Sequence, residues 1–183
     1  MTVVLLARHG RTALNVGGRL RGRMDPPLDA AGEAEAAALG GALASRRPAA
    51  VVTSPRLRAR QTAIQVASRA GLTFTTDSRL DDRDYGSWSG AVAADIVAEW
   101  GSLDRAPGVE PLDNVRQRVW EAMEWWVSVV DGTVVVVAHD AVNRMVLSVV
   151  QACGDEIGQR TGCWNELSHD EQGWHVLAVD QVP

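Results

Sequence analysis

The sequence of 183 residues contains no lysine and has two cysteines, one tyrosine and one phenylalanine. Cys153 and Cys163 are too few for the disulfide framework of a small secreted domain, and they do not have the spacing of a zinc site. The N-terminal apolar run, Val3 to Ala7, is far too short for a signal peptide or a membrane span. We therefore expect reduced thiols, a cytoplasmic location and no membrane partner.

Acidic residues outnumber basic ones, 23 to 18, and the formal net charge is -5. This balance argues against a nucleic-acid partner, because general binding to phosphate backbones needs a basic field. All 18 basic residues are arginines, and ten of them lie in the stretch from Arg8 to Arg60, so local phosphate recognition is compatible with the sequence. The length and the 46% hydrophobic content predict one folded domain over residues 1–183.

Two apolar runs lead directly into histidines. Val3 to Ala7 is followed by Arg8 and His9, and Thr133 to Ala138, with four consecutive valines, is followed by His139. Continuous apolar runs are typical of parallel strands that are buried on both faces. Because the carboxyl ends of parallel strands meet at one edge of a sheet, we expect both imidazoles on the same rim.

The remaining elements alternate between strands and helices. Asp29 is predicted to cap a helix that includes Ala34 to Ala44, and Ser54 to cap a helix that starts at Pro55 and ends at Ala70. The other predicted strands are Ala49–Thr53, Thr73–Thr76, Cys163–Leu167 and Trp174–Val179, and the other helices are Ala91–Trp100, Leu112–Val130 and Ala141–Ala152. This order predicts an α/β fold, a three-layer α/β/α sandwich with a mostly parallel sheet and an antiparallel edge strand in a C-terminal hairpin.

Two further predictions concern a loop and a buried helix face. Leu80 to Gly90 is predicted to be a loop, since it has no helix or strand period. In the helix over Leu112–Val130, one stripe is expected to face the core; it consists of Val115, Val119, Ala122, Met123 and Trp126.

Arg58 lies one turn after Ser54, near the start of its predicted helix, where an anion is favoured. A guanidinium group there and histidines at two strand ends together indicate a phosphate site. A metal hydrolase would need clustered histidines and carboxylates, whereas these histidines are scattered along the sequence. We therefore expect no metal and no cofactor.

These residues belong to segments that resemble the histidine phosphatase superfamily, in the branch that includes the cofactor-dependent phosphoglycerate mutases. The resemblance covers most of the chain, in the family's order and spacing. It is carried by RHGRTALN at 8–15, DPPL at 25–28, SPRLRARQTA at 54–63, GSWSG at 86–90 and the strand that ends at His139.

The resemblance implies a covalent mechanism. His9 attacks phosphorus, forms a phosphohistidine and later yields the phosphoryl group to water. Arg8, Arg58 and His139 are expected to surround the transferred group and to bind its oxygens, and Asn15 donates a further hydrogen bond. A backbone carbonyl that accepts from the other His9 nitrogen would fix the tautomer needed for attack.

Two carboxyl groups compete for the role of general acid. Where the mutase-like branch has a Glu, this sequence has Asp82, whose reach is about 1.5 Å shorter. Asp140 follows His139 as in the His-Asp pair of acid phosphatases and phytases, and is either the acid or a helix cap that helps keep His139 protonated. Asp82 is the favoured donor.

The expected substrate is a small phosphorylated metabolite, with Arg21 and Gly22 as further binding residues. Arg21 stands where many relatives have Gln, and the segment 108–111 resembles the family's Gly-Gly-Glu-Ser only loosely, so specificity is not transferred. The alternatives are a mutase, against which the short chain argues, and a phospho-ligand-binding module without turnover. Exposed tryptophans would mark a homodimer face, and a homodimer is a possible state.

Overall fold

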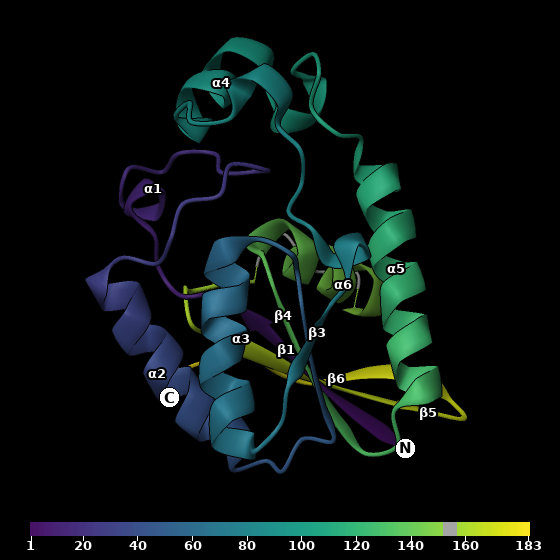
Figure 1. Cartoon of the computed structure of the whole chain (residues 1–183). Helices are drawn as coiled ribbons and strands as arrows, with labels where there is room; N and C mark the ends of the chain where they lie inside the picture. The colour runs from purple at the N-terminus through teal and green to yellow at the C-terminus, as the bar shows by residue number, and fades with distance from the viewer. Residues whose placement is uncertain (152–156) are drawn as a thin grey trace.

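The computed structural model describes residues 1–151 and 157–183, and its strands form one mixed sheet (Figure 1). The strands are β1 (Thr2–Arg8), β2 (Ala50–Thr53), β3 (Phe74–Thr76), β4 (Thr133–Ala138), β5 (Trp164–Asp170) and β6 (Gly173–Gln181). Their order across the sheet is β3-β2-β4-β1-β5-β6, with parallel pairing from β3 to β1 and antiparallel pairing of β5 with both neighbours. The predicted mostly parallel sheet with a hairpin at its edge is confirmed.

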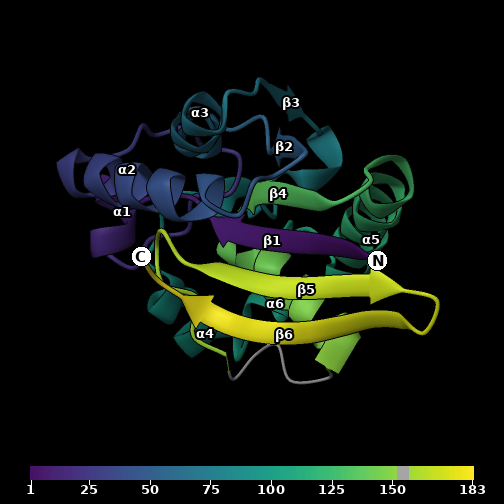
Figure 2. The same cartoon turned by 90° about the horizontal axis from the view of Figure 1, so that it is seen from below.

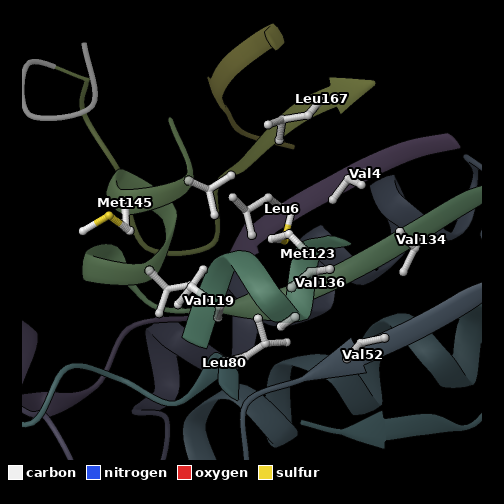
Figure 3. Packing of buried hydrophobic residues seen from close by; sticks show 14 of the residues in the cluster. Val4, Leu6, Val52, Leu80, Val119, Met123, Val134, Val136, Met145 and Leu167 are labelled. Carbon is white, nitrogen blue, oxygen red and sulfur yellow. The ribbon is translucent and has the colours of Figure 1, made fainter. Parts of the chain in front are cut away.

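Helices cover both faces of the sheet, as predicted. They are α2 (Ala30–Ala44) and α3 (Leu57–Ala70) on one face (Figure 2) and α5 (Leu112–Val129) and α6 (Asp140–Gln151) on the other. Successive residues of a strand point to opposite faces. Accordingly Leu5 and Ala7 of β1 pack with α2 and α3, whereas Val4 and Leu6 pack against Met123 of α5 and its neighbours (Figure 3). The core therefore holds β1 rigidly on both sides.

The two predicted helix caps have different outcomes. Asp29 caps α2 as predicted, since its carboxylate accepts from the Gly32 amide at 2.8 Å. The predicted start of α3 at Pro55 is wrong: the helix begins at Leu57, and Asp25 accepts from the Leu57 amide at 2.6 Å. The Ser54 hydroxyl accepts from the Arg56 amide at 3.3 Å, just before the helix, and also contacts the site described below.

The predicted inward stripe of α5 is confirmed for four of its members, which are fully or almost fully buried: Val115, Val119, Ala122 and Met123. The fifth, Trp126, is half-buried, and its indole N–H donates to the Asp77 carboxylate at 2.9 Å. In α6, the predicted last residue, Ala152, and Cys153 lie outside the described residues. None of the described helices is both long and apolar enough to cross a bilayer.

A small cap lies on the side of the molecule away from the N-terminus (Figure 1). It contains the short helices α1 (Ala13–Val16) and α4 (Ala93–Trp100) and the 3-10 turns at Gly86–Trp88 and Leu103–Arg105, whereas the 3-10 turn at Ser78–Leu80 packs against α5 in the main core. Its own apolar cluster consists of Leu20, Tyr85, Ile96 and Ala106 with partly buried neighbours. The cap therefore joins the loop after β1 to the loop that carries Asp82, and a bridge between Arg19 and Val92 connects the two.

Candidate active site

His9 and His139 lie beside each other at the ends of two neighbouring parallel strands. In the register of β1 and β4, Arg8 lies opposite Ala138, so the residue after each strand emerges at the same place. The two rings are 5.2 Å apart in an edge-to-face arrangement, and both side chains are fully buried. The structure thus brings together the two histidines that the sequence places at strand ends.

The hydrogen bonds of His9 identify its tautomer. Its Nδ1 lies 2.7 Å from the carbonyl oxygen of Gly10, which only accepts, so Nδ1 carries the proton. Nε2 receives a hydrogen bond from Nε of Arg58 at 3.3 Å, so it presents its lone pair. Burial, reinforced by the positive charges of Arg58, Arg8 and Arg21, holds the pKa of His9 well below 6.5. His9 is therefore neutral near pH 7, with a nucleophilic nitrogen.

Arg58 lies in the first turn of α3 and is fully buried. Besides its bond to His9, it donates to the carbonyl oxygens of Met24 at 2.8 Å and Gly22 at 2.9 Å, and to Asp82 at 2.8 Å. All three guanidinium nitrogens therefore have fixed partners. This network connects His9, the loop after β1 and the loop that carries Asp82 to one cation.

Asp82 lies between Arg58 and His139. Its Oδ2 is 2.8 Å from a guanidinium nitrogen of Arg58 and 3.7 Å from Nδ1 of His139, and its Oδ1 accepts from the Arg83 amide at 2.9 Å. Burial raises the pKa of Asp82 above its ordinary value, although the charge of Arg58 opposes this rise. A carboxyl group with a raised pKa is suited to delivering a proton near neutral pH.

His139 is held by Ser54. Nε2 of His139 lies 2.7 Å from the Ser54 hydroxyl, while Nδ1 is buried and has no hydrogen-bond partner among the described residues. Burial and the charge of Arg58 hold the pKa of His139 well below 6.5. The structure therefore assigns Ser54 to the site, a contact that the sequence did not reveal because the Ser-Pro pair was interpreted only as a helix start.

Arg8 contacts a different set of residues from those that surround Arg58. It donates to the carbonyl oxygen of Gln159 and lies 3.5 Å from Asp140. Asp140 is one-third exposed and also accepts from Arg144, four residues later on α6, at 3.0 Å. Its carboxylate is thus shared by two cations at the edge of the site. The contacts of Asp82, by comparison, reach Arg58 and His139 directly.

A buried network supports the carbonyl that binds Arg8. The Gln159 carboxamide exchanges hydrogen bonds with Asn165 of β5, at 2.9 Å in both directions, and accepts from Asn143 of α6 at 3.1 Å. Asn165 also donates to the Leu6 carbonyl of β1 at 3.2 Å. Sequence reasoning missed Gln159 and Asn165, because no local pattern shows that these segments meet beneath Arg8.

The three residues expected to bind substrate lie in the loop after β1. The side-chain oxygen of Asn15 accepts from the Thr12 amide and hydroxyl at 2.9 and 2.8 Å, so its amide nitrogen is the group that would donate to a ligand. Gly22 acts through its backbone: it has φ +46°, and a Cβ there would lie 2.9 Å from the Arg83 carbonyl. Arg21 lies beside it, with its Nε buried.

The loop that carries Asp82 is clamped by an ion pair. Arg118 of α5 binds Glu110 through two nitrogens at 2.9 and 3.0 Å. It also donates to the main-chain carbonyls of Arg79, Asp81 and Asp82 at 2.8, 2.7 and 3.2 Å. Glu110 lies in the segment that resembles the family motif only loosely, and the structure gives it a role: it fixes the loop of the carboxyl group.

Two glycines, Gly10 and Gly32, allow the backbone that follows His9 to approach α2. A Cβ on Gly10 would collide with the carbonyl oxygen of Gly32, and a Cβ on Gly32 would collide with the backbone of Arg11. The Gly10 amide also donates to the Thr62 hydroxyl of α3 at 3.1 Å. The backbone beside His9 is therefore packed directly against two helices.

The site offers anion binding and proton transfer. A neutral imidazole with a free lone pair, guanidinium groups around it and a buried carboxyl group with a raised pKa are what covalent phosphoryl transfer requires. Among the described residues, no three His, Cys, Asp or Glu side chains are grouped as metal ligands. The fold and site define the class of α/β proteins in which two buried histidines and two arginines meet at the carboxyl ends of parallel strands.

The sequence model of the histidine phosphatase superfamily (branch 1) matches residues 4–181, and the chain belongs to this superfamily. The predicted membership is thus confirmed. A glucosyl-3-phosphoglycerate phosphatase of Mycobacterium tuberculosis is 36% identical over 96 residues, which are 52% of this chain and 43% of that protein. The match spans less than half the length of this relative and of several other mycobacterial relatives.

Solved structures agree over nearly the whole chain. Bacillus stearothermophilus YhfR is 27% identical with a TM-score of 0.90, covering 100% of this chain and 98% of its own. A mycobacterial glucosyl-3-phosphoglycerate phosphatase in complex with VO3 is 27% identical with a TM-score of 0.85, covering 97% of this chain and 98% of its own. These likenesses confirm the predicted α/β fold.

Proposed function

We propose that the chain is a metal-independent phosphatase that hydrolyses small phosphate monoesters through a phosphohistidine on His9. The carrying observation is the hydrogen bonding of His9, whose Nδ1 proton is directed to Gly10 and whose Nε2 lone pair faces Arg58. The low pKa of His9 supports this proposal, because it keeps the nucleophile unprotonated near pH 7.

In the first step, Nε2 of His9 forms a bond to phosphorus while the ester P–O bond breaks. The phosphoryl group takes over the Arg58 Nε donor that His9 holds in the unliganded site. Arg8, Arg58 and His139 bind the equatorial oxygens. The two negative charges of the phosphate favour protonation of His139, because they counter the cations that depress its pKa.

Asp82 is the proposed general acid. It protonates the leaving oxygen in the first step, and then takes a proton from the water that attacks phosphorus as the N–P bond breaks. Its contacts with Arg58 and His139 and its raised pKa support this role. Asp140 is the alternative donor. Its pairing with Arg8 and Arg144 instead supports a positioning role for this carboxylate.

The proposed substrates are small phosphorylated metabolites. The name of the mycobacterial relative, glucosyl-3-phosphoglycerate phosphatase, supports this substrate class. The proposal also includes a single catalytic domain over residues 1–183 and assembly of two copies into a homodimer. The proposed location is the cytoplasm, where the buried Cys163 thiol is kept reduced. Size-exclusion chromatography with light scattering tests the homodimer directly.

Release of phosphate from a panel of phosphomonoesters in excess chelator tests the function. We expect turnover that His9→Ala lowers by about four orders of magnitude. The matched control is His175→Ala, in an exposed histidine of the β5–β6 hairpin, which should leave turnover unchanged. Rapid quenching followed by mass spectrometry should detect phosphate on His9, stable in base and labile in acid.

The same experiment separates the alternatives. Rearrangement of phosphoglycerates without release of phosphate would show a mutase. Saturable binding of phosphate esters without turnover of any of them would show a binding module. Turnover that the chelator abolishes, or that survives in His9→Ala, would contradict the proposed mechanism.

A further inference from the structure

Arg21 lies at the edge of the site on a tightly fixed stretch of backbone. The carbonyl of the next residue, Gly22, accepts from Arg58 at 2.9 Å. Gly22 itself is pressed against the main chain of Arg83 and the ring of Tyr85, so neither it nor its neighbour can move without disturbing Arg58. The backbone next to Arg21 is therefore fixed beside Arg58.

The charges of the site are paired except for that of Arg21. Arg58 lies against Asp82 and Arg8 against Asp140. Within residues 1–151 and 157–183, Arg21 makes no ion pair; one nitrogen donates to the Arg19 carbonyl at 3.3 Å, and the buried Nε has no hydrogen-bond partner. A buried guanidinium donor without an acceptor is costly in a folded protein, and such a group is commonly completed by a ligand.

The positive charge of Arg21 acts on the whole site. It helps to lower the pKa of His9 and of His139, and it opposes the rise in the pKa of Asp82. The backbone agrees with this placement, because the carbonyl of the adjacent Gly22 is bonded to Arg58. The transferred phosphoryl group already has the guanidinium groups of Arg8 and Arg58, so the charge of Arg21 is available for another part of the molecule.

We infer, given the phosphatase activity proposed above, that Arg21 selects substrates whose leaving group carries a second anionic group, a carboxylate or a second phosphate. The planar guanidinium fork matches either group with two parallel hydrogen bonds. The buried Nε supplies one donor, and a terminal nitrogen supplies the other after it leaves the long bond to Arg19. When the leaving group is uncharged, Nε of Arg21 has no acceptor.

Matched substrates test this assignment. 3-Phosphoglycerate and glycerol 3-phosphate differ by a carboxylate, and fructose 1,6-bisphosphate and fructose 6-phosphate differ by a phosphate. For Arg21→Gln we expect kcat/KM to fall about 10- to 100-fold for 3-phosphoglycerate, for the bisphosphate or for both. For glycerol 3-phosphate and fructose 6-phosphate, whose leaving groups are uncharged, we expect kcat/KM to fall by less than about threefold. Arg21→Lys should recover part of the loss.

Arg23→Gln is the control, because it removes one charge from the same loop at an exposed residue that is paired with Asp84. It should not discriminate within either pair. Titration calorimetry of the same four esters measures affinity without turnover, so a selective loss of affinity in Arg21→Gln supports the inference even if the parent protein hydrolyses none of them. Equal losses for both members of each pair, or no loss, would overturn it.

Discussion

The strand ends and the acidic loop supply their groups to the site in different ways. Arg8 is the last residue of β1, and His9 and His139 directly follow β1 and β4. The backbones of both strands are fixed by neighbouring strands on both sides and by helices on both faces. Asp82 lies in a loop whose backbone is held by the Arg118 side chain and by a few hydrogen bonds. The proposed nucleophile, His9, is therefore positioned by the sheet, whereas the proposed acid, Asp82, is positioned by side chains.

Because of this difference, mutations in the sheet and mutations in the loop should impair the protein in different ways. Damage to the sheet unfolds the protein, since its strands are the centre of the core. Damage to the loop clamp leaves the fold and the phosphate site in place, and displaces only the carboxyl group. The loop is thus the part of the site whose position can be altered while binding is retained.

Asp82→Asn should have the largest effect among variants of the two candidate acids. Loss of the proton donor is expected to lower kcat for alkyl phosphates by about 10²- to 10³-fold, and by less than about tenfold for p-nitrophenyl phosphate, whose leaving group needs no proton. Steady-state kinetics with both esters measures the difference. Asp140→Asn is the matched comparison, and a larger or more selective loss there would reverse the assignment.

The stability of the protein should fall as the pH falls from 7 towards 5. The folded-state pKa values of His9 and His139 lie well below 6.5, so below that pH the unfolded chain binds more protons than the folded one. Each such proton lowers the free energy of unfolding by about 1.4 kcal/mol per pH unit. Asp82 acts in the opposite direction, because its raised pKa gives stability at low pH that is lost as the pH rises through that value.

Urea unfolding at several pH values measures this dependence. Asp82→Asn removes the opposing contribution and should steepen the fall below pH 6.5. His175→Gln, on the exposed hairpin, should leave it unchanged. A free energy of unfolding that stays constant or rises between pH 7 and 5 would show that the two site histidines are not held neutral.

Breaking the clamp should have an intermediate effect. Arg118→Met is expected to lower kcat for alkyl phosphates about tenfold with little change in KM, because the loop no longer holds Asp82 in reach of the leaving oxygen. The loss should be smaller for p-nitrophenyl phosphate and should shift the alkaline limb of the pH profile of kcat/KM, because Asp82 must be protonated to act as the acid. Glu110→Gln should act in the same way, and Arg160→Met, at a peripheral ion pair with Asp180, should not.

The effect of Ser54→Ala should be the smallest. It leaves a buried nitrogen of His139 without its 2.7 Å partner, which should cost about 1 kcal/mol in stability and reduce kcat/KM by a few-fold. Thermal unfolding and steady-state kinetics measure the two effects. Ser68→Ala, at an exposed site on α3, provides the control. A loss as large as that of Asp82→Asn would show that Ser54 takes part in proton transfer.

The sequence predicts the strand-borne part of the site better than the rest, for a physical reason. A continuous apolar run that ends in a histidine is a local pattern, and parallel pairing alone brings His9 and His139 together. The roles of Ser54 and Gln159 depend on contacts between segments far apart in the chain, 85 residues in the case of Ser54 and His139. No spacing rule contains such information.

The error at the start of α3 has the same origin. Ser54 followed by Pro55 has the local features of a helix start, but Asp25, from a distant loop, supplies the acceptor for the helix amide. The hydroxyl of Ser54 is then available to His139. Propensity favours the local solution, and tertiary contacts replace it.

The glycine contact beneath the nucleophile also bears on how such proteins vary. Gly10 and Gly32 have no side chain to contribute to chemistry, yet any larger residue at either position would push α2 away from the loop that holds His9. In a deep mutational scan, these two positions should tolerate fewer substitutions than the exposed residues around them. A variant library or a directed-evolution campaign on this scaffold would therefore gain most by leaving both glycines fixed and diversifying the cap.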